Sequence, residues 1–203
     1  MKLRFISILL VINYFLSTPL IAQDSSKTLD GFLGIKFGSS YSYAKKVLSS
    51  KEGAKLDIKN SKNNKLIFDN LKFGGRQTSF IKLEFFQDKF YGAAVYYSSR
   101  LESQVEDLYS SIKSDLNSKY YSTDVDYRNF KSPYFDGDGY ETQAIKLGKA
   151  TIMSAWEFPQ SDGNKNSIFL RITEDLSIRL TYYCGKIAEQ AEAVEKNKNA
   201  TDY

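Results

Sequence analysis

The stretch LKFGGRQTSFIKLEFFQDKFYGAAVYY, residues 71–97, decides the fold. It predicts a strand, a turn at Gly74-Gly75, and then two strands joined by a tight turn at Gln87–Lys89. Ile81, Leu83 and Phe85 alternate with charged residues, a period of two that is typical of a half-buried strand. The stretch therefore predicts an antiparallel meander with one face against a core.

A second copy of the last two strands is predicted near the C-terminus. Residues 81–88 (IKLEFFQD) align with residues 168–175 (IFLRITED) at an offset of 87 residues, with apolar residues at the first, third and fifth places. We place a one-residue deletion in the second turn, so that residues 95–97 (VYY) align with residues 181–183 (TYY). Duplication is the favoured interpretation, but unrelated meanders also look alike because strands reuse β-branched and aromatic residues.

Two amphipathic helices precede these hairpins. Residues 41–48 form the first, capped by Ser39 or Ser40 and ending near Gly53. The second ends by about residue 119, and either Ser103 with Glu106 or Ser99 with Glu102 fits a capping box at its start. Its apolar residues lie at i, i+3, i+4, i+7 and i+11, namely Val105, Leu108, Tyr109, Ile112 and Leu116.

The second half carries further strands. Residues 124–130 are a candidate strand, and residues 140–147 and 150–158 are predicted to form a hairpin about Gly148-Lys149. Trp156 shares a strand face with Ile152 and Phe158, which favours a core position. The last hairpin spans residues 167–183, and residues 188–196 are predicted to be a terminal helix.

These elements predict an α+β fold. Two helix-plus-antiparallel-meander units form a mostly antiparallel sheet with helices packed on one face. We assign residues 1–22 to a signal peptide, 23–98 to the first unit, 99–184 to the second, and 185–203 to a C-terminal helix and disordered tail.

The N-terminus has the pattern of a signal peptide. Lys2 and Arg4 precede an apolar run at residues 6–16, and a polar break ends in Ala22, where we predict cleavage. An uncleaved anchor is disfavoured because the run is shorter than the ~20 residues of a transmembrane helix. We therefore expect a periplasmic or secreted protein without a stable membrane span after cleavage.

The order of a Gly34–Ser40 segment, a helix and a meander resembles the α/β modules of β-lactamase inhibitory proteins and of the outer-membrane assembly lipoprotein BamE. The tandem arrangement is more similar to the inhibitory proteins, which pair two such units into a curved sheet that grips a partner protein. The chain lacks the lipidated N-terminal Cys of BamE and the paired cysteines of the inhibitory proteins. The resemblance implies an envelope protein with a protein-binding sheet.

Composition excludes several kinds of chemistry. The chain has no His and a single cysteine, Cys184, which removes His-based nucleophile pairs, His-ligated zinc and an intramolecular disulfide. We predict no enzyme activity and no cofactor. The formal net charge is +4 and the lysines are scattered among acids, so no nucleic-acid partner is expected. Cys184 is either buried and inert or a reactive thiol, and burial is favoured.

The segment around residue 135 holds the candidate binding residues. Tyr134, Phe135 and Tyr140 lie in or beside a polar loop, and exposed aromatics are enriched at interaction surfaces. Asp136 and Asp138 could bind a calcium ion, or their Asp-Gly sequences could form ordinary turns. The turns are favoured, and we predict no metal site. The leading hypothesis is a protein-binding module, of inhibitor or immunity type, that uses the open sheet face. The alternative is a small-ligand or glycan binder that uses residues 130–140.

Overall fold

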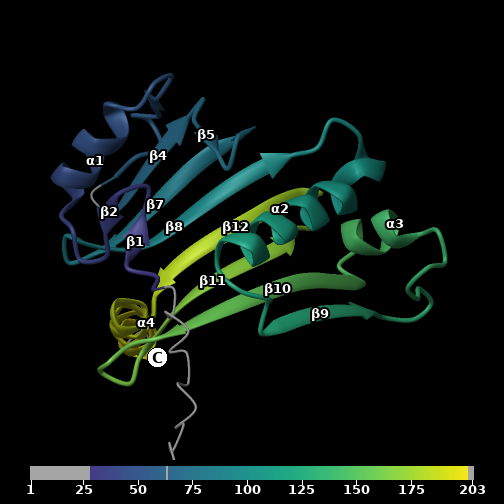
Figure 1. Cartoon of the computed structure of the whole chain (residues 1–203). Helices are drawn as coiled ribbons and strands as arrows, with labels where there is room; N and C mark the ends of the chain where they lie inside the picture. Colours follow the sequence, from purple (N-terminus) through teal and green to yellow (C-terminus); the bar gives the residue numbers. More distant parts are fainter. Residues whose placement is uncertain (1–27, 63, 201–203) are drawn as a thin grey trace, which may run out of the picture.

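An antiparallel sheet organises the molecule. The computed structural model describes residues 28–62 and 64–200, and within them eight strands form the main sheet (Figure 1). In spatial order these are β3 (Lys55–Leu56), β4 (Lys65–Asp69), β7 (Phe80–Phe86), β8 (Lys89–Ser98), β12 (Ser177–Cys184), β11 (Lys165–Ile172), β10 (Ala150–Pro159) and β9 (Val125–Phe130). Two small hairpins flank it, β1 (Gly31–Phe32) with β2 (Ile35–Lys36) and β5 (Lys72–Phe73) with β6 (Arg76–Gln77).

The strand order is symmetric about the boundary between β8 and β12. The first half contributes β3, β4, β7 and β8 from its edge to the centre, and the second half contributes β9, β10, β11 and β12 in the same way. Ala94 pairs with Thr181, while Ala93 pairs with Tyr182 and Val95 with Leu180. An offset of 87 residues maps the Ala93–Tyr182 pair onto the Leu180–Val95 pair, and it maps the Ala94–Thr181 pair onto itself. A pseudo-two-fold axis therefore passes through the Ala94–Thr181 pair.

The alignment of the two hairpins needs one correction. The predicted deletion in the second turn is wrong, because Phe85 pairs with Phe90 whereas Ile172 pairs with Ile178, which makes the second turn one residue longer. A bulge after Glu84 inserts the compensating residue into the first hairpin. The equivalent of Val95 is thus Tyr182 and not Thr181, and the offset stays 87 along both strands.

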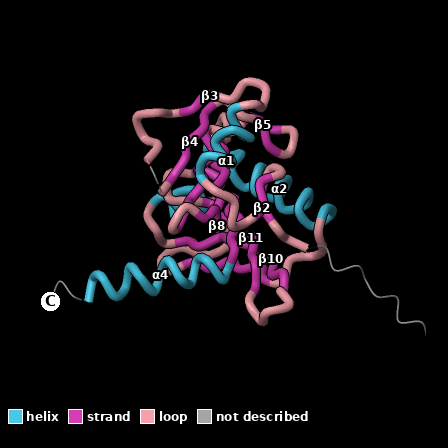
Figure 2. Tube along the Cα trace, turned by 90° about the vertical axis from the view of Figure 1, so that its left-hand side faces the viewer, coloured by secondary structure: helices cyan, strands magenta, loops and turns pink. Residues whose placement is uncertain are grey.

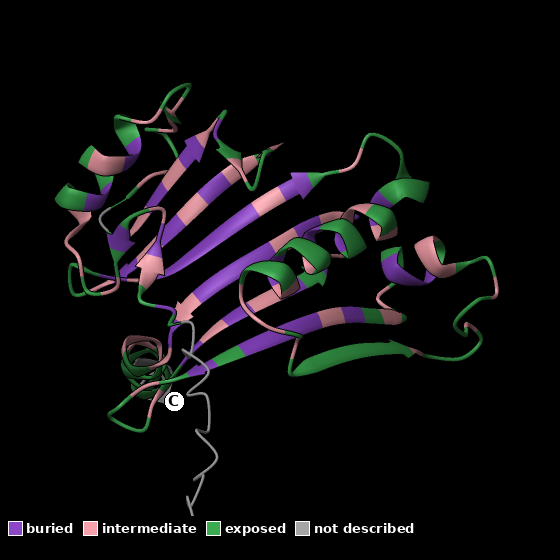
Figure 3. Ribbon diagram, viewed as in Figure 1, coloured by how far each residue is buried: buried purple, intermediate pink, exposed green. Residues whose placement is uncertain are grey.

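The helices α1 (Tyr41–Ser49), α2 (Val105–Lys119) and α3 (Glu141–Lys146) cover the face of the sheet that we call the inner face. Ser40 caps α1, and its side chain accepts a hydrogen bond from the Tyr43 N–H. Trp156 lies fully buried on this face and donates to the Asn117 Oδ1 of α2 at 3.1 Å. Buried residues accordingly follow the central strands, while β9 is exposed along most of its length (Figure 3).

Two local predictions are wrong. Residues 140–147 were predicted to be a strand, but residues 141–146 form α3, and β10 pairs with β9 across the long connection. The adjacent Ala144 and Ile145 are both buried, which a helical turn permits and strand alternation does not.

The capping box of α2 is absent, because Gln104 occupies the N-cap position without a side-chain hydrogen bond and a short 3₁₀ helix (Glu102–Gln104) leads into α2.

The predicted terminal helix is α4 (Gly185–Ala200), and it extends from the sheet on the side away from α2 (Figure 2). Any side chain at Gly185 would meet the Lys165 carbonyl oxygen, since an added Cβ would lie 2.1 Å from it. Asn166 fixes the start of the helix, accepting a hydrogen bond from the Gly185 N–H and donating to the Leu29 carbonyl. The predicted signal segment, residues 1–22, lies outside the described residues.

Candidate functional site

The loop that carries Tyr134, Phe135 and Tyr140 joins β9 to α3. Phe135 and Tyr140 are exposed, at 65% and 61% of their accessible surface, and Tyr134 is half-buried. Four cavities in the described part of the chain are lined by other residues. The structure thus places two of the three predicted residues on the surface, and none of the three lines any of these four cavities.

The two aspartates of this loop serve its own backbone and a neighbouring arginine. The carboxylate of Asp138 accepts hydrogen bonds from the N–H groups of Phe135 and Tyr140, at 3.0 and 2.7 Å. Asp136 accepts from Arg128 at 2.6 Å. In the described part of the chain no group of three or more His, Cys, Asp or Glu side chains could hold a metal ion. The bonds of Asp138 are the turn chemistry of an Asp-Gly sequence, and the bond of Asp136 is an ion pair that ties the loop to β9.

The outer face of the sheet, opposite α1 and α2, carries a continuous row of aromatic, methionine and arginine side chains. Each residue is the register partner of the next across six neighbouring strands. Phe80 and Tyr96 stack at the first end of the row, with ring centroids 4.2 Å apart. We call this set the arginine row, and its members are Phe80, Tyr96, Arg179, Arg171, Met153 and Tyr127.

Two like charges meet in the middle of the arginine row. Arg171 on β11 lies directly opposite Arg179 on β12. Neither forms an ion pair with a carboxylate among the residues that the structure describes. Burial and the neighbouring Arg179 lower the pKa of Arg171, although its guanidinium stays charged at neutral pH. Like charges directly opposite one another destabilise a sheet, so folding alone does not explain this pair.

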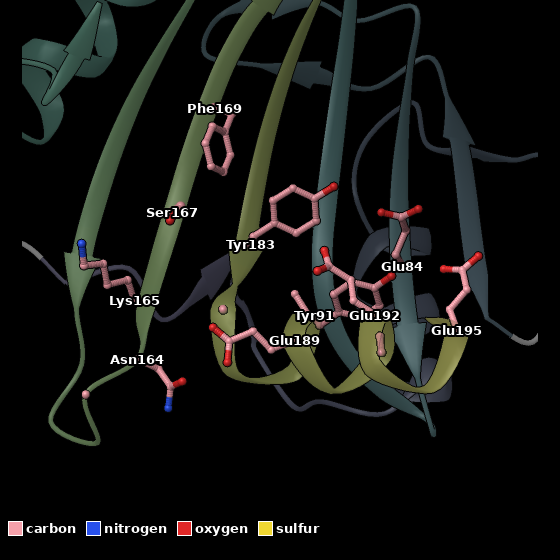
Figure 4. Close-up of a pocket in the computed structure, with 14 residues that line it drawn as sticks. Glu84, Tyr91, Asn164, Lys165, Ser167, Phe169, Tyr183, Glu189, Glu192 and Glu195 are labelled. Carbon is pink, nitrogen blue, oxygen red and sulfur yellow. The ribbon is translucent and has the colours of Figure 1, made fainter. Parts of the chain in front are cut away.

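A groove lies at the other end of the outer face, between α4 and the sheet (Figure 4). Its volume is about 710 Å³, and its floor consists of the rings of Tyr91, Phe169 and Tyr183. Tyr91 and Tyr183 stack with centroids 6.5 Å apart, and Phe169 meets Tyr183 edge-on at 6.2 Å. We call this the α4 groove, and its carboxylates are Glu84 on β7 and Glu189, Glu192 and Glu195 on α4.

The carboxylates give the α4 groove a negative potential. Burial raises the pKa of Tyr91 to about 12, and Glu84 is the largest of the charged groups that add to this shift. The pKa of Tyr183 is raised by the same two causes, burial first and then Glu84. Both phenols are therefore neutral at physiological pH and present uncharged aromatic faces to whatever enters. An aromatic floor under carboxylates attracts a cation.

Sequence reasoning missed the α4 groove. Small residues at 188 and 191 and glutamates at 189, 192 and 195 recur every three residues, which places Ala188 and Ala191 on one side of the helix and carboxylates beside them. This spacing was a usable signal for a helix that packs closely along an acidic edge. What the sequence lacks is the tertiary contact that turns α4 back over the ends of β7, β8, β11 and β12.

The single cysteine lines neither feature, although its chain neighbours Tyr183 and Gly185 line the α4 groove. Cys184 pairs in register with Asn166 at the end of β12 and is buried, as the sequence favoured. Two of the acids near the groove already form ion pairs, Glu84 with Lys82 at 2.8 Å and Glu157 with Lys165 at 2.5 Å.

The chain matches no protein-family model, no curated protein and no solved structure. The resemblance to β-lactamase inhibitory proteins and to BamE stays a prediction. None of the described helices has both the length and the apolar character that crossing a membrane requires.

Proposed function

We propose that the chain is a non-catalytic module that binds a protein partner across the outer face of its sheet. The opposed pair of Arg171 and Arg179 carries this proposal. An acidic group of a partner placed between the two guanidinium groups would offset their repulsion and accept paired hydrogen bonds from each. The pair is thus costly in the free protein and favourable in a complex.

The neighbours of the two arginines support the same conclusion. The arginine row contains only Phe, Tyr, Met and Arg, and these residue types are enriched in protein–protein interfaces. Tyr and Arg in particular are the residues that most often dominate binding energy. A row of them on rigid strands, rather than on loops, presents a preorganised surface.

The other parts of the proposal rest on sequence. The absence of His from the chain supports a role without acid–base or nucleophilic catalysis, and the signal-peptide pattern of residues 1–22 supports a periplasmic or secreted location. The alternative, a glycan or small-ligand site at residues 130–140, has weaker support because Tyr134, Phe135 and Tyr140 line none of the described cavities.

Site-specific photo-crosslinking in the native cell tests the proposal. A benzophenone amino acid replaces Phe80 or Tyr127 at the ends of the arginine row. As controls it replaces the exposed Tyr43 of α1 or the exposed Ile58 of the loop between β3 and β4. We expect one adduct of defined mass from the two row positions and none from the controls.

Charge reversal then shows whether the adduct depends on the arginines. Arg171→Glu with Arg179→Glu should abolish the adduct, whereas Arg100→Glu, a change of an exposed arginine outside the row, should leave it unchanged. Equal cross-linking from row and control positions, or an adduct that survives the double reversal, would overturn the proposal.

A further inference from the structure

We propose that the α4 groove binds a basic side chain, a lysine or an arginine, that projects from the protein partner. This inference rests on the proposed function, because the groove and the arginine row belong to the same outer face. It adds a second contact of opposite charge. A partner would present an acidic group to Arg171 and Arg179 and a basic group to the groove.

The groove is large enough to admit one long side chain together with part of the backbone that carries it. A space of about 710 Å³ between a helix and a sheet exceeds a single residue and leaves room for the backbone that carries it. The floor can contact the methylene stem of a lysine or arginine, while the rings of Tyr91 and Tyr183 attract its charged end. Ala188 and Ala191 on α4 are small, which keeps the groove open.

The charges of the groove favour a cation, because four carboxylates line it and the lysine that also lines it, Lys165, is paired with Glu157. Glu84 is already paired with Lys82, whereas Glu189, Glu192 and Glu195 form no ion pair with another described side chain. These three carboxylates follow one edge of α4 above the aromatic floor (Figure 4). An incoming ammonium or guanidinium group therefore meets both an aromatic face and unpaired negative charge.

The position of the groove indicates a side chain of the partner rather than a free organic cation. The same two central strands carry Arg179 and Tyr96 of the arginine row and Tyr183 of the groove. Thr181, between them on β12, is buried, so the two features are separated on that strand by a single outward-facing residue. A protein segment that crosses the outer face over β12 reaches both.

The groove is also held in place before any partner arrives. The Asn166 carboxamide and the close approach of Gly185 to Lys165 fix the direction in which α4 leaves β12. Lys186 forms an ion pair with Asp162 at 3.0 Å, which ties the first turn of α4 to the β10–β11 loop. A preorganised groove loses less conformational entropy on binding.

A peptide titration followed by NMR tests the inference on the full chain. The probe is acetyl-Gly-Ala-Lys-Ala-Gly-amide, and its control is the same peptide with an acetylated lysine side chain, which keeps the length and removes the charge. We expect shift changes at the backbone amides of Tyr91, Tyr183, Ala188 and Ala191 with the lysine peptide only. The affinity should fall as ionic strength rises.

Two sets of variants separate charge from ring contact. Glu189→Gln with Glu192→Gln should weaken binding about 5- to 30-fold, whereas Glu52→Gln with Asp107→Asn, a matched loss of two exposed acids elsewhere, should not. Tyr91→Leu should weaken it about 2- to 5-fold while Tyr91→Phe retains it. Folding of all these variants can be checked by the unperturbed amide spectrum of α3, which carries none of the changes.

The outcomes discriminate among occupants. Equal binding of the acetylated peptide, or unchanged binding after loss of Glu189 and Glu192 charge, would overturn the inference. Binding of spermidine as tight as that of the peptide would overturn the assignment to a partner side chain. If the cross-link at Phe80 forms but the peptide does not bind, this inference fails and the proposed function stands. If the peptide binds but no cross-link forms, the proposed function fails.

Discussion

The arginine row and the α4 groove occupy equivalent positions of one pseudosymmetric sheet, yet they carry opposite charge. The offset of 87 residues that relates the two halves places Arg171 at the position of Glu84 and Arg179 at the position of Gly92. Tyr96 and Tyr183 are equivalent as well, and both are aromatic. The same backbone accepts an arginine pair at one end and an acidic groove at the other, so the charges are not requirements of the fold.

The two ends also differ in what surrounds their charges. Glu84 forms an ion pair with Lys82 at 2.8 Å and lies beside α4, whereas Arg171 has no carboxylate partner among the described residues and no helix over it. The charge of Glu84 on the sheet is thus satisfied by a neighbouring lysine, whereas the charges of its equivalent Arg171 and of Arg179 are not. This contrast supports the proposal that the arginine row meets an acidic group of another molecule.

The largest expected effect on stability comes from the core beneath the arginine row and the α4 groove. Leu180 is 1% exposed and lies on the inner face of β12, and its pseudosymmetric equivalent on β8 is Ala93. Leu180→Ala should lower the free energy of unfolding by about 2–5 kcal/mol, because the lost side chain leaves a cavity. Chemical denaturation measures this loss.

The matched control is Leu147→Ala, at an exposed position, which should change the free energy of unfolding by less than about 0.5 kcal/mol. A loss at Leu180 no larger than that at Leu147 would contradict the placement of the core between sheet and α2. If the arginine row and the α4 groove do not depend on this core position, the folded fraction of Leu180→Ala should still cross-link to the partner and bind the lysine peptide.

Much of this fold could be predicted from residue patterns, because local alternation and helical spacing report which side chains are buried. Ile81, Leu83 and Phe85 are buried on the inner face as predicted, and α2 has the residues that its spacing indicated. Residues 141–146 were assigned wrongly because a six-residue segment is too short for its period to distinguish a helix from a strand.

The candidate site was harder to predict for a physical reason. Exposed aromatics such as Phe135 are visible in a sequence, but a cavity forms only when elements distant along the chain come together. The α4 groove joins Glu84 to Glu195, and the arginine row joins Phe80 to Arg179. The offset of 87 residues already aligns Glu84 with Arg171 in the sequence, but the bulge near Tyr91 was missed, so residues 95–97 were aligned one residue out of register.

A smaller effect on stability is expected from adding a side chain at Gly92, in the half of the outer face that forms the α4 groove. Gly92 lies under Tyr183, and a Cβ added there would be 3.0 Å from the ring. Gly92→Ala should cost about 1 kcal/mol of stability, since the strain of overpacking exceeds the gain from replacing a strand glycine. It should also displace Tyr183 and weaken binding of the lysine peptide. Denaturation and the NMR titration measure the two effects, and a more stable variant with unchanged binding would contradict the predicted contact.

The smallest expected change is a gain. Arg171→Gln removes one of two opposed charges, so the free energy of unfolding should rise by about 0.5 kcal/mol at low salt. The gain should shrink as salt screens the repulsion in the native protein, and Arg100→Gln, at an exposed arginine outside the row, should show no comparable salt dependence. Denaturation at several ionic strengths measures this difference, and a variant that is less stable at every salt concentration would mean that Arg171 contributes to folding. A variant that is more stable yet no longer cross-links to the partner would show two things. The arginine pair destabilises the free protein, and the same pair stabilises the complex, as the contrast with Glu84 requires.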